Sequence, residues 1–198
     1  MNPADIPVLI LAAGRSQRFG SIKALANYRG QSLLGRCLDQ IRPLNPEPYL
    51  ALGAYREQIR RELDGMLRGV SVVEVTDWQD GMSASLKAGI ARIQMDEPES
   101  SGVLVFLGDQ PKVDTGIVKR FMETIQVMPD AIIAADYGGK PGVPAYLPKR
   151  IWERMSELKG DQGAGKVIAS LPHHLIEIGS AGEDVDTPED LARIQGQD

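Results

Sequence analysis

The sequence predicts an α/β fold with a mostly parallel central sheet. Short, nearly continuous apolar runs alternate with segments of helical periodicity, about every 20 to 30 residues along the chain. Such apolar runs are typical of parallel strands that are buried on both faces. Because the 198 residues contain no internal repeat and no interdomain linker, we expect one domain over 1–198.

Seven strands are expected, each from an apolar or β-branched run. The runs 6–12 and 102–108 are apolar almost throughout, as central parallel strands are. The run 142–147 is predicted to be an edge strand, because Pro144 has no N–H to donate to a neighbouring strand. The remaining strands are expected at 48–53, 70–75, 130–136 and 174–178.

Helices are expected between these strands. The segment 32–41 carries an apolar stripe that includes Cys37, so this cysteine is expected in the core. Asp114 or Thr115 is the expected N-cap of a later helix, and Thr187 that of the last helix. In chain order the predicted helices span 32–41, 56–67, 83–93, 114–125, 149–158, 163–171 and 187–194.

Composition excludes several classes of function. A net charge of -5 argues against a general affinity for nucleic acid or anionic membrane surfaces. The single cysteine allows no intrachain disulfide and is consistent with a reducing compartment. The longest apolar run, 6–13, is too short to span a membrane, so the expected location is the cytoplasm.

A glycine-containing loop follows the first predicted strand and reads G-x-S-x-R-x-G-x-x-K. Ser16 stands where a dinucleotide-binding fingerprint needs its second glycine, so that interpretation fails. A plain turn with solvated cations is the alternative. Three cations within nine residues of an acidic protein favour phosphate binding instead, with backbone N–H groups cradling the oxygens. The motif residues are Gly14, Ser16, Arg18, Gly20 and Lys23, and the third cation is Arg15.

A second glycine loop, 160–167, matches only the beginning of a P-loop. Val167 stands where a magnesium-ligating Ser or Thr is required, and the preceding segment has a helical rather than a strand pattern. A helix that begins near Gln162 or Gly163, with Asp161 as its cap, would still offer its N-terminus to a second anion.

Acidic residues lie where open α/β sheets place their ligands. Asp109 follows the strand 102–108 directly and has no capping role, so we interpret it as a magnesium ligand. The segment DVDTPEDL offers Asp184 and Asp186. Asp186 is either a second carboxylate for the same ion or part of the turn that enters the last helix.

Six ordered motifs carry a resemblance over nearly the whole chain. They are LAAGRSQRFGSIK near the start, DGMSASLKAG at 80–89, FLGDQP at 106–111, GKPGVPAYL at 139–147, LKGDQGAGKVI at 158–168 and DVDTPEDL at 184–191. Together they resemble the molybdenum cofactor nucleotidyltransferases of the MobA-like superfamily, and most of all their cytidylyltransferase branch. The resemblance implies a three-layer, Rossmann-like nucleotidyltransferase fold of the nucleotide-diphospho-sugar transferase type.

The resemblance also implies an activity and its residues. CMP would pass from CTP to the phosphate of molybdenum cofactor (molybdopterin), with Mg²⁺ as cofactor and pyrophosphate as the second product. A downstream molybdoenzyme or its chaperone would receive that product. The implied catalytic residues are Arg18, Lys23 and Asp109; the nucleotide-binding residues Ala12, Ala13, Gly14, Arg15, Ser16, Gly20, Lys23, Gly81, Ser85 and Asp109; the metal ligands Asp109 and Asp186; and the acceptor-binding residues Asp161, Gln162 and Gly163.

One departure from the family pattern concerns the second substrate. Cytidylyltransferases of this branch usually read Pro-Gly-His-Pro where this chain has Val143 between Gly142 and Pro144. The motif AAG followed by RFG is similar to the cytidine-selecting pattern and concerns the nucleotide. The replacement of the histidine by Val143, in contrast, leaves the acceptor open. The alternatives are another phosphorylated acceptor, such as a sugar phosphate, or a non-catalytic nucleotide-binding module.

Overall fold

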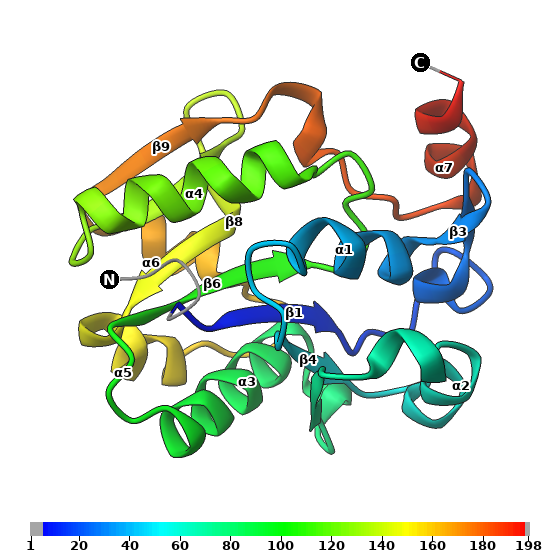
Figure 1. The fold of residues 1–198 in the computed structure, drawn as a ribbon, viewed down its shortest axis with the longest axis horizontal. Helices are drawn as coiled ribbons and strands as arrows, with labels where there is room; N and C mark the ends of the chain where they lie inside the picture. Colours follow the sequence, from blue (N-terminus) through cyan, green and yellow to red (C-terminus); the bar gives the residue numbers. More distant parts are fainter. Residues whose placement is uncertain (1–5, 197–198) are drawn as a thin grey trace.

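The computed structural model describes residues 6–196 and shows the predicted α/β fold, with a central sheet between two layers of helices (Figure 1). Seven strands form this sheet in the order β5-β4-β1-β6-β8-β7-β9. Within it, β8 runs antiparallel to both of its neighbours, and the other pairings are parallel. The strands are β1 Val8–Ala12, β4 Tyr49–Leu52, β5 Ser71–Glu74, β6 Gly102–Leu107, β7 Ile132–Asp136, β8 Pro141–Pro148 and β9 His173–Glu177; the hairpin β2 Asn27–Tyr28 and β3 Gln31–Ser32 is separate.

The helices cover both faces of the sheet. Buried residues of α1, α2 and α4 form one apolar cluster with one face, and those of α3, α5 and α6 form a second cluster with the other. Cys37 is buried in the first cluster, as predicted. The helices are α1 Leu33–Ile41, α2 Arg56–Glu62, α3 Met82–Asp96, α4 Thr115–Val127, α5 Trp152–Ser156, α6 Ala164–Ala169 and α7 Pro188–Gln195.

Two of the predicted helix starts are confirmed by their caps. The side chain of Asp114 accepts a hydrogen bond from the backbone N–H of Ile117 and begins α4. Thr187 and Asp190 form a reciprocal capping box at α7. The helices expected over 56–67 and 149–158 are shorter than predicted, because each of these segments includes a 3₁₀ turn.

The prediction that 142–147 is an edge strand is wrong, because β8 lies between β6 and β7. In its pairing with β7, Ala145 faces Ala134 while Gly142 faces Ala135, so two residues of β8 bulge out of register. Pro144 is one of the two. The pairing with β6 begins only at Ala145. The missing N–H of Pro144 therefore falls where neither neighbouring strand is paired with it.

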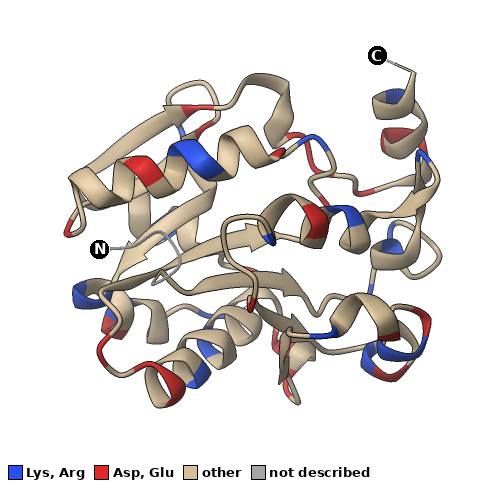
Figure 2. Cartoon of the chain, viewed as in Figure 1, with Lys and Arg blue, Asp and Glu red and all other residues tan. Residues whose placement is uncertain are grey.

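Charged residues lie mostly outside the centre of the sheet. Figure 2 shows Lys, Arg, Asp and Glu on helices and loops, whereas β1, β4 and β6 carry none.

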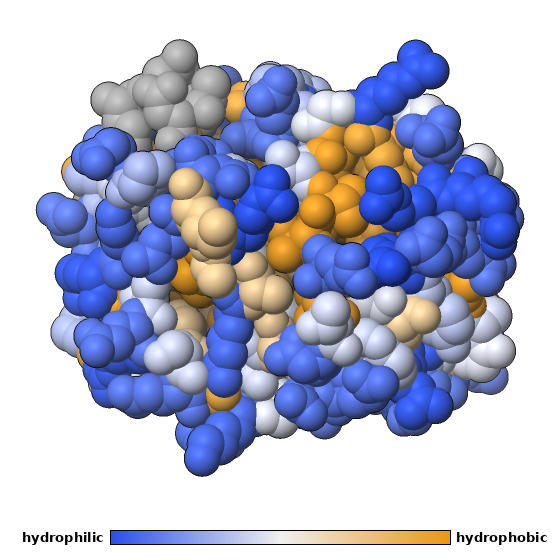
Figure 3. Space-filling view, turned by 90° about the horizontal axis from the view of Figure 1, so that it is seen from below, coloured by the Kyte–Doolittle hydropathy of each residue, from blue (hydrophilic) through white to orange (hydrophobic). Residues whose placement is uncertain are grey.

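In the view from below, most of the surface is hydrophilic, and hydrophobic residues reach it in a patch in the right half (Figure 3). Within residues 6–196, no helix is both long enough and apolar enough to cross a membrane.

A small third apolar cluster joins the beginning of the chain to its end. Phe19, Tyr28, Leu33, Val185 and Ile194 are its buried members. The backbone N–H of Val185 also donates to the carbonyl oxygen of Asp109, in the loop after β6, at a distance of 3.0 Å. Figure 1 accordingly shows α7 beside β3. This third cluster brings the loop after β1, the loop after β6 and the segment before α7 together.

Candidate functional site

A hollow of about 730 Å³ lies at the carboxyl ends of β1 and β6, where ligands bind in open α/β sheets. Three other surface hollows are smaller, at about 490 to 530 Å³. Most of the predicted site residues line the large hollow: Ala12, Ala13, Gly14, Arg15, Ser16, Arg18, Lys23, Gly81, Ser85, Asp109, Asp161 and Asp186. Gly20, Gln162 and Gly163 do not line it.

The loop after β1 is closed by hydrogen bonds to Ser16. Its carbonyl oxygen accepts from the N–H groups of Phe19 and Gly20 at 3.0 and 3.2 Å, and its hydroxyl accepts from the N–H of Lys23 at 3.2 Å. Gly20 has φ +76° and lies outside the lining of the hollow, so its contribution is to the turn. The bonded loop holds the backbone of Lys23 at the rim of the hollow.

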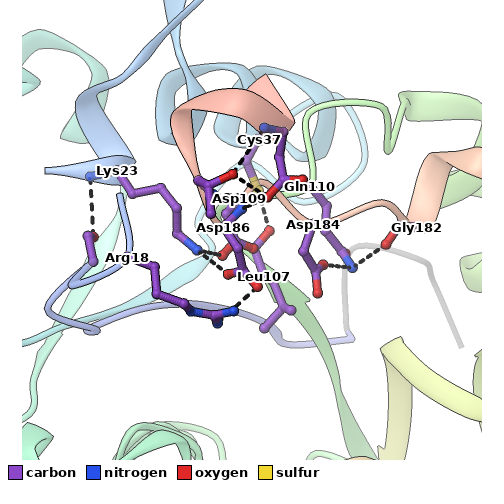
Figure 4. Close-up of polar contacts among 12 residues, drawn as sticks. Arg18, Lys23, Cys37, Leu107, Asp109, Gln110, Gly182, Asp184 and Asp186 are labelled. Atoms are coloured by element: carbon purple, nitrogen blue, oxygen red, sulfur yellow. Dashed lines mark hydrogen bonds and ion pairs between the residues drawn. The ribbon is translucent and has the colours of Figure 1, made fainter. Parts of the chain in front are cut away.

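Basic and acidic side chains form an ion-pair network across the hollow (Figure 4). The Nζ atom of Lys23 lies 2.5 Å from Oδ2 of Asp109 and 3.2 Å from Oδ1 of Asp186. Arg18 reaches the other oxygen of Asp186 at 2.9 Å from a side chain that is 73% exposed. Burial by itself lowers the pKa of Lys23, but the two neighbouring carboxylates outweigh it and raise that pKa above 10.5. Lys23 therefore remains a cation at neutral pH.

Asp109 is held by its backbone and has one carboxylate oxygen left over. Its carbonyl accepts from Val185 N, and its Oδ2 pairs with Lys23. Its Oδ1 is buried and has no hydrogen-bond partner among residues 6–196. An orphaned buried oxygen of this kind is costly unless a further ligand pairs with it.

Asp184 is a third carboxylate at this site; the segment DVDTPEDL offered it beside Asp186, but no role was predicted for it. Nε2 of the buried Gln110 donates to Oδ1 of Asp184 at 2.8 Å (Figure 4). The same Nε2 also lies 2.8 Å from the hydroxyl of Tyr137. Partial withdrawal from water and the nearby charge of Asp109 raise the pKa of Asp184 to about 6. The spacing D-x-D in an extended segment was the available signal, since alternate residues point the same way.

The oxygen donors of this site fit a hard cation such as Mg²⁺. Asp109 offers an unpaired oxygen, and Asp186 lies on the other side of the Lys23 ammonium. In the described part of the chain, no group of three or more Asp, Glu, His or Cys side chains is arranged to hold a metal ion alone. A metal here would need further oxygen ligands from a bound phosphate.

Trp78 is a second residue that the predicted set lacked. Its ring lines the hollow, and the guanidinium of Arg15 lies 5.7 Å from the ring centre. An aromatic residue in a loop that enters a predicted helix, close after the strand 70–75, was the available signal. Together, Arg15 and Trp78 form one wall of the hollow.

Gly81 allows the loop around residue 160 to approach the hollow. It has φ +87°, and a Cβ atom there would lie 2.5 Å from the backbone carbon of Gly160. This close approach brings Asp161 to the hollow. The expectation that Asp161 caps the next helix is wrong, because α6 begins at Ala164 with Gly163 as N-cap and no side-chain cap bond. The tight turn at 160–163 takes Asp161 towards Gly81 instead.

Comparisons with known proteins agree with this architecture. Rv0371c from Mycobacterium tuberculosis H37Rv is 31% identical with a TM-score of 0.79, and the match covers 96% of this chain and 97% of that one. A structure of Rv0371C in complex with manganese aligns with a TM-score of 0.80 at 30% identity, over 98% and 99% of the two chains.

Two curated relatives are more distant. The purine catabolism protein PucB of Bacillus subtilis (strain 168) is 23% identical in an alignment of 202 positions that covers 94% of each chain. A molybdenum cofactor guanylyltransferase of Ectopseudomonas mendocina (strain ymp) is 28% identical over 131 residues, covering 66% of this chain and 60% of the relative. The family model of the MobA-like NTP transferase domain matches residues 8–175, which is most of the chain. The chain therefore belongs to the MobA-like NTP transferase domain family.

Proposed function

We propose that this nucleotidyltransferase transfers CMP from CTP to the phosphate of molybdenum cofactor and releases pyrophosphate. The observation that carries the transfer chemistry is the pairing of Lys23 and Arg18 with Asp109 and Asp186 at the rim of the hollow. Cations that can bind a triphosphate thus lie beside carboxylates that can bind its metal. The choice of CTP and of the acceptor rests on the motif resemblance, and the guanylyltransferase relative supports a molybdenum cofactor substrate.

In the proposed reaction the acceptor phosphate attacks the α-phosphorus of CTP in line. A new P–O bond forms, the bond between the α- and β-phosphates breaks, and pyrophosphate leaves with the electron pair. The attacking oxygen is already anionic, so no protein base needs to remove a proton. Lys23 and Arg18 bind the phosphate oxygens and neutralise the charge that develops on them. Asp109 and Asp186 would hold Mg²⁺, which supplies Lewis-acid stabilisation of that charge when bound.

The remaining residues are proposed to orient the two substrates. Ala12 and Ala13, together with Gly81 and Ser85, line the hollow and are assigned to the base and ribose. The segment 161–163 is assigned to the acceptor, and Asp161 is its member that reaches the hollow.

A second candidate is transfer to a different phosphorylated acceptor, and Val143 favours it. Its carbonyl accepts hydrogen bonds from Gln110 and Tyr137, while its side chain packs against the second apolar cluster, which α3, α5 and α6 form with the sheet. No polar side chain stands where the cytidylyltransferase pattern has a histidine. PucB, which matches over nearly its whole length, is named for purine catabolism.

A pyrophosphate-release assay separates these possibilities. CTP, GTP, ATP and UTP are each paired with molybdenum cofactor or with a sugar 1-phosphate, with and without Mg²⁺. We expect release with CTP and molybdenum cofactor, in the presence of metal. Release with GTP instead would overturn the nucleotide assignment, and release only with the sugar phosphate would support the second candidate. Nucleotide binding without release under every condition would overturn both.

A further inference from the structure

The ammonium group of Lys23 lies between the two carboxylates that are proposed to hold the metal. It is 2.5 Å from Oδ2 of Asp109 and 3.2 Å from Oδ1 of Asp186, and its side chain is only 17% exposed (Figure 4). The position between two carboxylates is the one that a divalent cation would take. In the ligand-free chain, the lysine and a metal therefore compete for the same oxygens.

The backbone of Lys23 is fixed, whereas its side chain is free to change partners. Its N–H donates to the hydroxyl of Ser16, and its carbonyl accepts from the N–H of Ala26 at 2.9 Å. The side chain beyond it is a flexible four-carbon stem that ends in three donors. A swing of the ammonium group towards a bound triphosphate would leave both carboxylates open without moving the loop.

The charges at the site determine when this swing is favourable. Asp109, Asp184 and Asp186 face the cations Lys23 and Arg18. A divalent ion alone would either meet the Lys23 ammonium at contact distance or force it away from its partners, and both outcomes are unfavourable. A nucleoside triphosphate brings about four negative charges, which give Lys23 new partners while supplying the metal with oxygen ligands.

We infer that Lys23 closes the metal site of the ligand-free chain, and that the divalent ion binds much more tightly together with a nucleoside triphosphate than alone. This inference rests on the metal site of the proposed function and adds a binding order to it. Lys23 then has two partners in succession, the carboxylates before binding and the phosphates afterwards. The two ligands bind with positive coupling, and that coupling depends on this one side chain.

The test measures Mn²⁺ binding directly, by the electron paramagnetic resonance signal of the free ion. Wild type, Lys23→Met and a control, Lys119→Met, are titrated with Mn²⁺ in the absence and in the presence of α,β-methylene-CTP. Lys119 is an exposed lysine on α4 that pairs only loosely with Glu123, at 3.7 Å. A thermal-unfolding measurement on each variant shows whether it is folded and how far Mn²⁺ raises its Tm.

Without nucleotide, we expect Lys23→Met to bind Mn²⁺ about tenfold more tightly than wild type, because a competing cation is removed. The nucleotide analogue should tighten Mn²⁺ binding to wild type by about 5- to 150-fold, the usual range of coupling between two ligands. It should do so much less in Lys23→Met. The control should behave as wild type in both conditions.

Weaker or unchanged Mn²⁺ binding by nucleotide-free Lys23→Met, with a normal Tm, would overturn the inference and leave the proposed metal site standing. If Lys23→Met is unfolded, Lys23→Gln replaces it under the same criteria. Asp109→Asn distinguishes a failure of the inferred role of Lys23 from a failure of the metal site. Should this variant bind Mn²⁺ with nucleotide as tightly as wild type does, the metal site itself is misassigned and both conclusions fail.

Discussion

Replacing Asp109 by asparagine tests the site most directly, because the change keeps the shape of the side chain and removes one charge. In wild type, Oδ2 pairs with Lys23 and Oδ1 is buried without a partner. The variant loses the charge that the proposed metal requires and places an amide where the carboxylate stood. We therefore expect the metal-dependent rate to fall while the fold persists.

The expected magnitudes differ for rate and stability. Removing one preorganised electrostatic contact costs about 10² to 10³ in kcat, or about 2.7 to 4 kcal/mol of transition-state stabilisation. The folded state loses less, because Lys23 keeps Asp186 as a partner at 3.2 Å. We expect a loss of about 1 kcal/mol, which corresponds to roughly 2 to 4 °C in Tm for a chain of this size.

The assay is steady-state pyrophosphate release from CTP and molybdenum cofactor over a range of Mg²⁺ concentrations, with circular dichroism melting of the same samples. Glu123→Gln is the matched control, since it removes one exposed carboxylate on α4 and should leave both readouts unchanged. A kcat for Asp109→Asn within tenfold of wild type would refute the assignment. So would a large drop in Tm, because the lost activity would then follow from unfolding.

Three further predictions concern other parts of the site. The folded-state pKa of Asp184 is raised from 3.8 to about 6, so ionisation of this carboxyl lowers the stability of the fold as the pH rises from 4 to 6. The variant Asp184→Asn should therefore have the same Tm as wild type at pH 4 and a higher Tm than wild type above pH 6. Solvent screening limits that gain to about 1 kcal/mol, or about 2 to 4 °C, and a gain at pH 4 instead would contradict it. Gly81→Ala should lower the free energy of unfolding in urea by about 1 to 3 kcal/mol and raise KM for the nucleotide, because the added Cβ would clash with Gly160. The control is Gly65→Ala, since Gly65 has open space around it. Burial raises the pKa of Cys37 to about 12, so the native chain should resist a thiol reagent at pH 8 and react only in denaturant.

The fold class was predictable because it depends on local patterns. Apolar runs and helical stripes are properties of ten or so neighbouring residues, and each of the predicted strands is present in the structure. The order of the strands is not local. The position of β8 between β6 and β7 depends on a bulge that accommodates Pro144, and the rule that places proline at a sheet edge does not foresee such a bulge.

The site was predictable only as far as strand ends reveal it. Gly14 and Asp109 each follow a strand, and the end of a parallel strand is a place to look for ligands whatever the rest of the fold does. Asp184 directly follows no strand of the central sheet, and its place depends on Val185, which is fully buried in the third apolar cluster.

That cluster is apolar and joins residues far apart in the chain, so no charge pattern in the sequence predicts it. Once Phe19 and Val185 are buried in this cluster, the residues beside them have little freedom. Arg18 and Lys23 lie near Phe19 in the chain, and Asp184 and Asp186 are the neighbours of Val185. The ion-pair network is therefore assembled by hydrophobic packing behind it. Its charged members can exchange partners when a ligand binds, because the packing and not the ion pairs holds the segments in place.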